Sequence, residues 1–257
     1  MRMPTLFIGH GNPMNALEDN AYTRAWNTIG KELPEPKTIL SISAHWYAPG
    51  TAVTVMERPP TIHDFGGFPR ELFAFEYPAS GDPALAQRVR ALLAPATVED
   101  DQQWGLDHGT WAVLCHIFPR ANIPVVQLRI DETQPPEFHY ELAKRLSPLR
   151  EEGVLILGSG NVVHNLHAYA WGRHPMEPFE WALHFEQRLR RALEKRDDLA
   201  IVQYEVWGRD AALAVPTPEH YLPLIYVAAL RRSDDELRFP VEGIDGGSVS
   251  MLAVQFG

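Results

Sequence analysis

The fold is decided by the stretch Thr38–Trp46, which reads TILSISAHW. Its apolar and β-branched residues predict a buried strand over Thr38–Ala44, and His45 follows directly at the end of that strand. In an open α/β sheet, the carboxyl ends of the strands line the crevice in which ligands bind. A histidine at that position is therefore a candidate metal ligand or proton-transfer group.

The same arrangement of strand and histidine occurs twice more. A short strand predicted at Thr5–Ile8 leads to His10, which stands between two glycines that let the backbone approach a ligand closely. A strand predicted at Val154–Leu157 leads through Gly-Ser-Gly to His164. Three matching placements indicate that these histidines meet in one site at the carboxyl ends of the strands.

Strand and helix signals alternate through the rest of the chain. The 257 residues, 45% apolar and 22% charged, predict a single domain over 1–257. The predicted class is α/β, with a central mostly parallel or mixed sheet flanked by helices. Helices are predicted at Glu18–Leu33, Asp82–Leu93, Trp111–Phe118, Glu137–Arg150, Pro178–Lys195 and Thr217–Leu230, and further strands at Ala52–Met56, Val125–Ile130 and Ser248–Phe256.

Charge and composition disfavour several classes of partner. The net charge of −10 and the pI of about 5.5 argue against nucleic acid and anionic membranes as partners. The longest apolar stretch, Tyr221–Leu230, is too short to cross a bilayer. The one cysteine, Cys115, excludes an intrachain disulfide and is interpreted as packing rather than as a nucleophile. With no secretory pattern at the N-terminus, these features predict a cytoplasmic protein and leave its oligomeric state open.

A long irregular segment, Arg58–Tyr77, is rich in proline, glycine and phenylalanine. Its four phenylalanines argue against disorder, so we predict an ordered pocket wall or lid. Aromatic side chains from this segment and from nearby motifs are expected to pack on a substrate ring. These candidate substrate contacts are Phe65, Phe68, Trp46 and Trp104, with His63 beside them.

His220 falls at the third position of a predicted helix, with Thr217 as the N-cap and Pro218 as the first helical residue. A charged imidazole gains nothing from the positive end of a helix dipole. His220 is therefore better explained as a neutral group that binds a metal. The neighbouring Glu219 suits the dipole in the first turn and is interpreted as structural.

His108 lies between Asp107 and Gly109, in a loop just before a predicted helix. It is a candidate general acid or base. The alternative is a role in helix entry, with Asp107 or Thr110 as the cap. The other histidines are interpreted as structural or surface groups: His116, His139, His167, His174 and His184.

Three or four neutral imidazoles without a cysteine suit one divalent ion, namely zinc, iron or another borderline ion. Calcium or magnesium would require more oxygen ligands. No P-loop, dinucleotide fingerprint or Gly-x-Ser-x-Gly motif occurs in the sequence. The residues by themselves thus indicate an α/β metalloenzyme.

Six motifs occur in order along the chain: LFIGHGNPM at 6–14, SAHW at 43–46, HDFGGFP at 63–69, WGLDHG at 104–109, GSGNVVHN at 158–165 and PTPEHYLP at 216–223. Together they resemble the 4,5-DOPA extradiol dioxygenase family. That family belongs to the class III ring-cleaving dioxygenases, to which the protocatechuate 4,5-dioxygenase β-subunit is related. The resemblance covers nearly the full chain.

The resemblance implies one divalent metal bound by His10 and His45. His220 stands where the class III group supplies a third ligand, typically a glutamate. An all-histidine set suits zinc as well as iron(II), and members resembling this chain are commonly described as zinc-binding. His164 matches a position given as an additional ligand or a catalytic histidine, and His108 matches the acid/base histidine of the class.

The implied activity is extradiol cleavage of a catechol such as DOPA, which chelates the metal while O2 is inserted beside the diol. His108 or His164 would take and return a proton, and Arg129 is a candidate contact for a substrate carboxylate. One alternative is a zinc-dependent hydrolase of a small molecule, with His108 or Glu219 as the base. Another is a non-enzymatic module that binds small aromatics.

Overall fold

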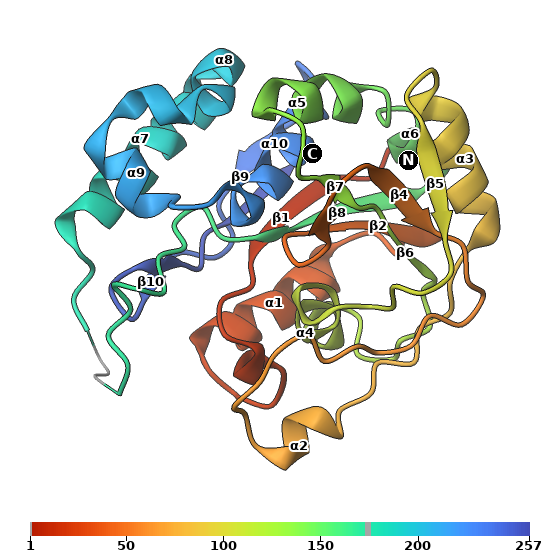
Figure 1. Ribbon diagram of the computed structural model, residues 1–257, viewed down its shortest axis with the longest axis horizontal. Helices are drawn as coiled ribbons and strands as arrows, with labels where there is room; N and C mark the ends of the chain where they lie inside the picture. Colours follow the sequence, from red (N-terminus) through yellow and green to blue (C-terminus); the bar gives the residue numbers. More distant parts are fainter. Residues whose placement is uncertain (1, 173–175) are drawn as a thin grey trace.

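The chain is arranged around one six-stranded sheet with helices on both faces (Figure 1). A computed structural model describes residues 2–172 and 176–257, so His174 lies outside the described residues. From edge to edge the sheet consists of β6 (Val125–Gln127), β2 (Thr38–Ser43), β8 (Val154–Gly160), β1 (Thr5–Gly9), β12 (Ala253–Phe256) and β9 (Leu237–Arg238). The first four strands are parallel, whereas β12 and β9 run antiparallel to their neighbours. The predicted α/β class with a mixed central sheet is confirmed.

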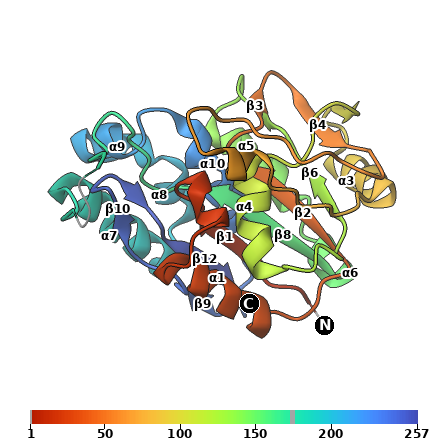
Figure 2. The ribbon, with the colours of Figure 1, turned by 90° about the horizontal axis from the view of Figure 1, so that it is seen from below.

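Side chains alternate between the two faces of the sheet, as the period of a strand requires. Leu6 and Ile8 of β1 pack in the apolar cluster that contains Trp26 and Trp111, whereas Phe7 belongs to the cluster on the opposite face. Figure 2 shows α1 and α4 side by side over one face. The main covering helices are α1 (Ala21–Glu32) and α4 (His108–Ile117) on that face, and α5 (Pro136–Lys144), α7 (Glu180–Lys195) and α10 (Leu222–Ala229) on the other.

The register of the parallel strands brings their carboxyl ends to one edge. Ser159 of β8 pairs with Ile8 on one side and with Ser43 on the other. Beyond these pairs, the His10 amide donates to the Gly160 carbonyl at 3.0 Å. The sheet therefore places the residues that follow β1 and β2 on either side of β8.

The remaining elements are short. Three small two-stranded sheets and several helices and 3-10 turns surround the main sheet. The strand pairs are β3 (Tyr47–Ala48) with β7 (Ile130–Asp131), β4 (Thr51–Thr54) with β5 (Val98–Asp101), and β10 (Ile244–Asp245) with β11 (Val249–Ser250). The helices and turns are α2 (Arg70–Phe73), α3 (Pro83–Leu93), α6 (Leu149–Glu152), α8 (Asp198–Val202), α9 (Arg209–Ala214), η1 (Pro13–Ala16), η2 (Tyr204–Trp207) and η3 (Pro218–His220).

Prolines interrupt two of the predicted helices. The helix predicted at Glu137–Arg150 ends at Lys144, and a separate α6 begins after Pro148. The helix predicted at Thr217–Leu230 is divided into η3 and α10, with Pro223 in the first turn of α10. A proline has no amide proton to continue a helix from the preceding turn. For this reason, each of the two continuous helices that were predicted is divided into two shorter elements.

Two strand predictions were also too long. The strand predicted at Val125–Ile130 is divided into β6 and β7, because the Arg129 amide leaves the main sheet to donate to the Ala52 carbonyl at 2.8 Å. The strand predicted at Ser248–Phe256 is divided into β11 and β12. The segment 198–214, for which the sequence predicted no element, forms α8, η2 and α9.

The segment Arg58–Tyr77 is ordered and mostly irregular, apart from α2. Its side chains Phe65, Phe68 and Phe75 are partly buried against the cluster that contains Trp111. Among the described residues, no helix combines the length and apolar character needed to cross a bilayer.

Candidate metal centre and active site

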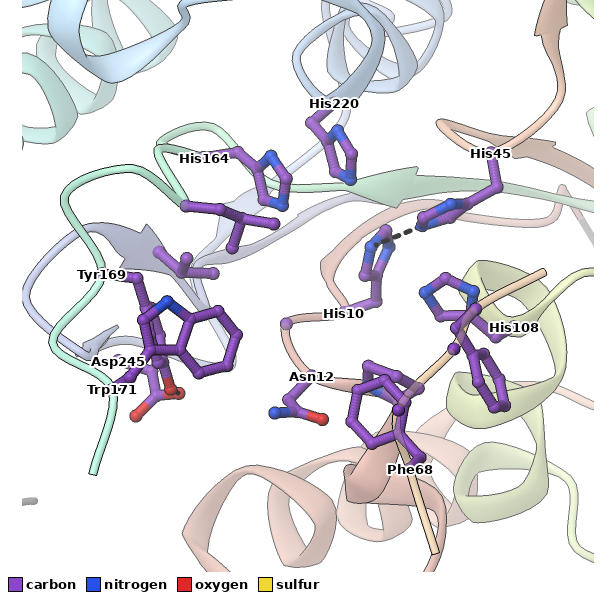
Figure 3. Close-up of a pocket in the computed structure, with 17 residues that line it drawn as sticks. His10, Asn12, His45, Phe68, His108, His164, Tyr169, Trp171, His220 and Asp245 are labelled. Carbon is purple, nitrogen blue, oxygen red and sulfur yellow. Dashed lines mark hydrogen bonds between the residues drawn. The ribbon is translucent and has the colours of Figure 1, made fainter. Parts of the chain in front are cut away.

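Five histidines line a cavity of about 430 Å³ at the carboxyl edge of the sheet (Figure 3). His10 follows β1 directly, and His45 comes two residues after β2. His164 follows β8, His220 ends η3, and His108 begins α4. Figure 3 shows their rings converging from separate elements toward one end of the cavity.

His10, His45 and His220 come closest to a shared ligand sphere. One ring nitrogen from each lies within 4.8 Å of the corresponding atoms of the other two. The Nε2 atoms of His10 and His45 are 3.2 Å apart. The sequence separation of these residues is large, so the fold alone brings them together.

The Nδ1 atom of each of these three imidazoles contacts a polar side chain. His10 Nδ1 lies 3.0 Å from Ser159 Oγ, and the hydroxyl of Ser159 donates its only proton to the Gly109 carbonyl. His10 Nδ1 must therefore be the donor to Ser159. His45 Nδ1 lies 3.2 Å from Asp64 Oδ2, and His220 Nδ1 lies 3.1 Å from Glu219 Oε1. Carboxylates only accept hydrogen bonds, so these two Nδ1 atoms are also donors.

The Nε2 atom of each ring is then left for another partner, and those of His10 and His45 face each other. The dashed line in Figure 3 marks this contact, which is a hydrogen bond when one of the two rings carries its proton at Nε2 and leaves two facing lone pairs when both carry it at Nδ1. Burial lowers the pKa of His10 and His220 well below the ordinary value, and the neighbouring imidazoles lower both further. His10 and His220 are therefore neutral at pH 7.

A divalent metal fits this donor set. Metal-binding histidines typically donate the other ring N–H to a carboxylate or hydroxyl, which fixes the ring and its tautomer. Ser159, Asp64 and Glu219 stand in those positions here. Imidazole nitrogens suit zinc and iron(II) alike. The arrangement thus matches a metal site without selecting the ion.

Glu219 lies behind His220 rather than beside His10 and His45. Its Oε1 accepts from His220 Nδ1 and from Thr217 Oγ1, the latter at 2.8 Å. Thr217 is the N-cap residue and Pro218 the first residue of η3, as predicted, but the Thr217 hydroxyl bonds Glu219 and makes no capping hydrogen bond to the backbone. The interpretation of Glu219 as structural agrees with this position, which also orients a candidate ligand.

His108 is held at the start of α4 by two carboxylates. Asp107 caps the helix by accepting from the Thr110 amide at 3.0 Å, so the predicted helix entry is present. Asp64 Oδ1 lies 2.9 Å from His108 Nδ1, and the ring centroids of His108 and His45 are 3.8 Å apart. Burial and the nearby His45 lower the pKa of His108, although Asp64 opposes this shift. His108 is therefore neutral at pH 7, with Nε2 as a proton acceptor.

Asp64 is a carboxylate that contacts two of the clustered histidines, His45 and His108. Burial by itself raises the pKa of Asp64, but the hydrogen bonds from His108 and His45 outweigh this and hold that pKa well below its usual range. The carboxylate is therefore ionised and accepts from both rings.

His164 stands beside the cluster rather than within it. Its ring stacks on His220 with centroids 3.5 Å apart and an angle of 9° between the planes. Its ligand atom groups with those of Glu219 and His220 and not with that of His10. Burial lowers the pKa of His164 to about 4, although the Glu219 charge opposes the shift. A neutral imidazole at this position can accept a proton in the cavity.

Of the predicted substrate contacts, Phe65 and Phe68 line the cavity, and Phe65 packs edge-on against His108 at 5.4 Å between ring centroids. His63 does not, because its Nε2 bonds the Phe75 carbonyl at 3.0 Å and its ring packs on Trp111. The prediction that His63 contacts substrate therefore has no support in the geometry.

Trp46 and Trp104 are also absent from the cavity lining. Trp46 is only 3% exposed, and its ring stacks on that of Trp104 with centroids 5.6 Å apart. Arg129 lies over Trp46 and bonds the Gly50 carbonyl and Glu99. Because Trp46 turns away from the carboxyl edge after β2, all three side chains form a separate cluster. Trp46, Trp104 and Arg129 were predicted to contact the substrate, but they do not line the cavity.

Several residues of the site gave no clear signal in the sequence. Asp64 and Ser159 stand within quoted motifs, but their spacing does not reveal that they bond His45 and His10. The wall opposite Phe68 comes from the segments after β8 and around β10, which carried no recognisable pattern. That wall consists of Leu166, Tyr169, Trp171, Asp245 and Val249.

Cys115 lies away from this chemistry. Its Sγ donates to the Ala112 carbonyl, and burial raises the pKa of the thiol to about 12. A thiol with that pKa is a poor nucleophile at pH 7, which agrees with its interpretation as a packing residue.

Comparison with known proteins gives this geometry a family. Residues 5–224 match the family model described as the catalytic LigB subunit of aromatic ring-opening dioxygenase. The chain belongs to this family. It is 49% identical over its full length to 4,5-DOPA dioxygenase extradiol of Escherichia coli K12, covering 95% of that protein. It is 36% identical to the protein of the same name from Beta vulgaris, with 98% of this chain and 96% of that one covered.

A solved structure shares the whole fold. The crystal structure of an uncharacterized protein from Escherichia coli K12 superposes with a TM-score of 0.87 at 45% identity, and each chain is covered completely. The resemblance to the 4,5-DOPA extradiol dioxygenase family is thus confirmed. The protein is an aromatic ring-opening dioxygenase of a family whose enzymes use a metal, which favours this activity over the hydrolase and the binding module.

Proposed function

We propose that the chain cleaves a catechol such as DOPA beside its diol, with O2 as the co-substrate and one divalent metal held by His10, His45 and His220. The observation that carries this proposal is the convergence of three imidazoles whose Nδ1 atoms are all engaged. Their bare Nε2 atoms face the cavity end at which a diol can chelate the same ion. In this proposal the whole chain forms one catalytic domain. The cytoplasmic location of the protein stays a prediction.

Iron(II) is the proposed active ion, because a redox-active metal can mediate electron transfer between a chelated catecholate and O2. Zinc does not change its oxidation state, so it can only orient and acidify the diol. Zinc is therefore expected to bind the same three histidines without supporting ring opening.

Two neutral histidines flank the proposed ligands. His108 lies next to His45, and His164 stacks on His220 (Figure 3). Both have a lowered pKa, so both can accept a proton at pH 7. We assign the first diol proton to His108, whose Nδ1 is fixed by Asp64 and which later releases it to solvent. We assign the second diol proton to His164, which returns it to the opened product.

The apolar walls provide a slot for the ring of the substrate. Phe68 stands on one side, with Phe65 packed against it, and Trp171 stands on the other. Such aromatic faces stack on a catechol ring and exclude water from the diol. Among the described lining residues, none is a lysine or arginine. The proposed recognition of the ring therefore depends on aromatic packing and chelation.

The proposal is tested by loading the metal-free chain anaerobically with iron(II) and then supplying O2 and DOPA. An oxygen electrode should record uptake of one O2 per substrate, and mass spectrometry with labelled O2 should find both oxygen atoms in the product. The zinc-loaded chain and an iron-loaded His10→Ala variant are the controls, and both should be inactive. Lack of O2 uptake by the iron-loaded chain with DOPA and with simple catechols would contradict the proposal.

A further inference from the structure

The carboxylate of Asp64 contacts two imidazoles with different proposed tasks. Its Oδ2 lies 3.2 Å from His45 Nδ1, on a proposed metal ligand. Its Oδ1 lies 2.9 Å from His108 Nδ1, on the proposed proton acceptor, and also accepts from the His108 backbone amide at 3.0 Å. Asp64 comes from the irregular segment before α2, so neither histidine's own element supplies it.

We propose that Asp64 is a positioning residue that fixes the tautomers of His45 and His108 together, so that one Nε2 is free for the metal and the other is free for the proton of the diol. For the role of His108, this inference rests on the proposed function. The tautomers themselves do not depend on it.

The argument depends on what a carboxylate can and cannot do. It carries no proton when ionised, so every neighbour that bonds to it must donate. A neutral imidazole has a single N–H, which is then used at Nδ1 in both rings. Both Nε2 atoms are left as lone pairs while the ring centroids stay 3.8 Å apart. One side chain thus prepares a ligand and a base in adjacent positions.

An amide of the same shape cannot replace it. Asn offers one accepting oxygen and one donating NH2 group, so it cannot accept from both imidazoles. The orientation that keeps more bonds leaves the oxygen on His108, which donates twice, and turns the NH2 group toward His45. His45 must then move its proton to Nε2, where the proton blocks the metal position.

The chain contains a matched control in Glu219. This carboxylate also orients a proposed ligand, but a single oxygen, Oε1, accepts from both His220 and Thr217. Glu219→Gln removes the same charge and keeps an accepting oxygen for both donors. It is therefore expected to leave every imidazole tautomer of the cluster unchanged.

Long-range nitrogen NMR of the metal-free protein reads the tautomers directly. In the unmodified chain, His45 and His108 should both be protonated at Nδ1. In Asp64→Asn, one of them, expected to be His45, should be protonated at Nε2, whereas Glu219→Gln should resemble the unmodified chain. Protonation of either ring at Nε2 in the unmodified chain overturns the inference, so it remains falsifiable even if the variant does not fold. Unchanged tautomers in a folded Asp64→Asn variant also overturn it.

Metal affinity provides a second readout that needs no turnover. Competition with a chelator for Zn²⁺ should show a loss of about 10- to 100-fold in Asp64→Asn, and a smaller loss in Glu219→Gln. Equal losses of Zn²⁺ affinity in the two variants would mean that Asp64 acts only through its negative charge. That result would overturn the proposal that Asp64 sets the tautomers of both histidines. If the iron-loaded chain opens no catechol while these tautomers and affinities are as expected, the proposed function fails and the positioning by Asp64 stands.

Discussion

Two buried polar clusters of this protein differ in whether protein atoms complete them. Arg150 is 0% exposed, and its guanidinium donates to both oxygens of Asp235 at 2.6 and 3.0 Å. It also donates to the carbonyls of Met3, Leu230 and Phe256. The histidine cluster is also largely buried, but it opens onto the cavity, and the Nε2 atoms of His10 and His45 face each other there.

The difference separates a structural cluster from a functional one. Arg150 joins the segment before β1, the last strand and the segment after α10, and its hydrogen bonds are all made within the protein. In the histidine cluster, every Nδ1 is satisfied and every proposed ligand atom is left open. Buried polar groups normally find partners, so an arrangement of unsatisfied acceptors points to an ion that belongs there.

The largest expected effect on stability follows from removing the centre of the complete cluster. Arg150→Met leaves Asp235 as a buried charge that has lost its main partner, which typically costs about 3–5 kcal/mol. Urea unfolding of the metal-free chain should show this loss. Arg90→Met, which removes the partly exposed pair with Asp100, is the control and should cost at most about 1 kcal/mol. Similar losses in the two variants would mean that burial does not distinguish these pairs.

A pH dependence should arise from His139, a buried histidine outside the cavity whose Nδ1 contacts the Tyr226 hydroxyl at 2.9 Å. Burial lowers the pKa of His139 to about 4, although Asp131 opposes the shift. Since the unfolded chain protonates near pH 6.5, stability is full above that pH and falls by about 3 kcal/mol as pH decreases to 4. His139→Gln should lose less stability over this window. The other buried histidines are present in both proteins, so their contributions cancel in the difference. Parallel curves of stability against pH for the two proteins would show that His139 does not titrate in this way.

The core of the fold was accessible from the sequence because its signals are local. β1, β2 and β8 are apolar runs, and each is followed within four residues by a histidine. The antiparallel addition of β12 and β9 was not predictable, because strand pairing at an edge depends on where the chain returns in space. The split of the helix predicted at Glu137–Arg150 was marked by Pro148 and was nevertheless missed.

Only the part of the candidate site that directly follows the parallel strands was predictable from the sequence. His10 and His45 follow strands that flank β8, so their approach follows from topology. Asp64 reaches His45 through an irregular segment whose path no periodicity describes. Trp46 illustrates the opposite error. It adjoins His45 in sequence, but successive residues after a strand point in different directions, and its ring packs on Trp104 instead.

Metal binding is the direct test of the incomplete cluster. At a concentration 100 times its dissociation constant, Zn²⁺ should raise the free energy of unfolding by about 2.7 kcal/mol, because the unfolded chain lacks the assembled site. Arg150→Met should show the same gain from a lower starting point, since its cluster is separate. His10→Ala should show almost none. A gain that survives in His10→Ala would place the bound ion at some other group of ligands.

The smallest effect is expected at the open end of the cavity. Trp171 is 62% exposed and stands opposite Phe68, where its indole can cover one face of a bound ring (Figure 3). Trp171→Ala should raise KM for DOPA by about 5- to 30-fold, equivalent to about 1–2 kcal/mol, with little change in kcat, because the indole packs on Tyr169 and has no proposed role in proton transfer. Leu199→Ala, at a similarly exposed apolar residue outside the cavity, is the control and should leave KM unchanged. A fall in kcat at constant KM would instead assign Trp171 to the reaction step, and the aromatic wall would then do more than bind the substrate.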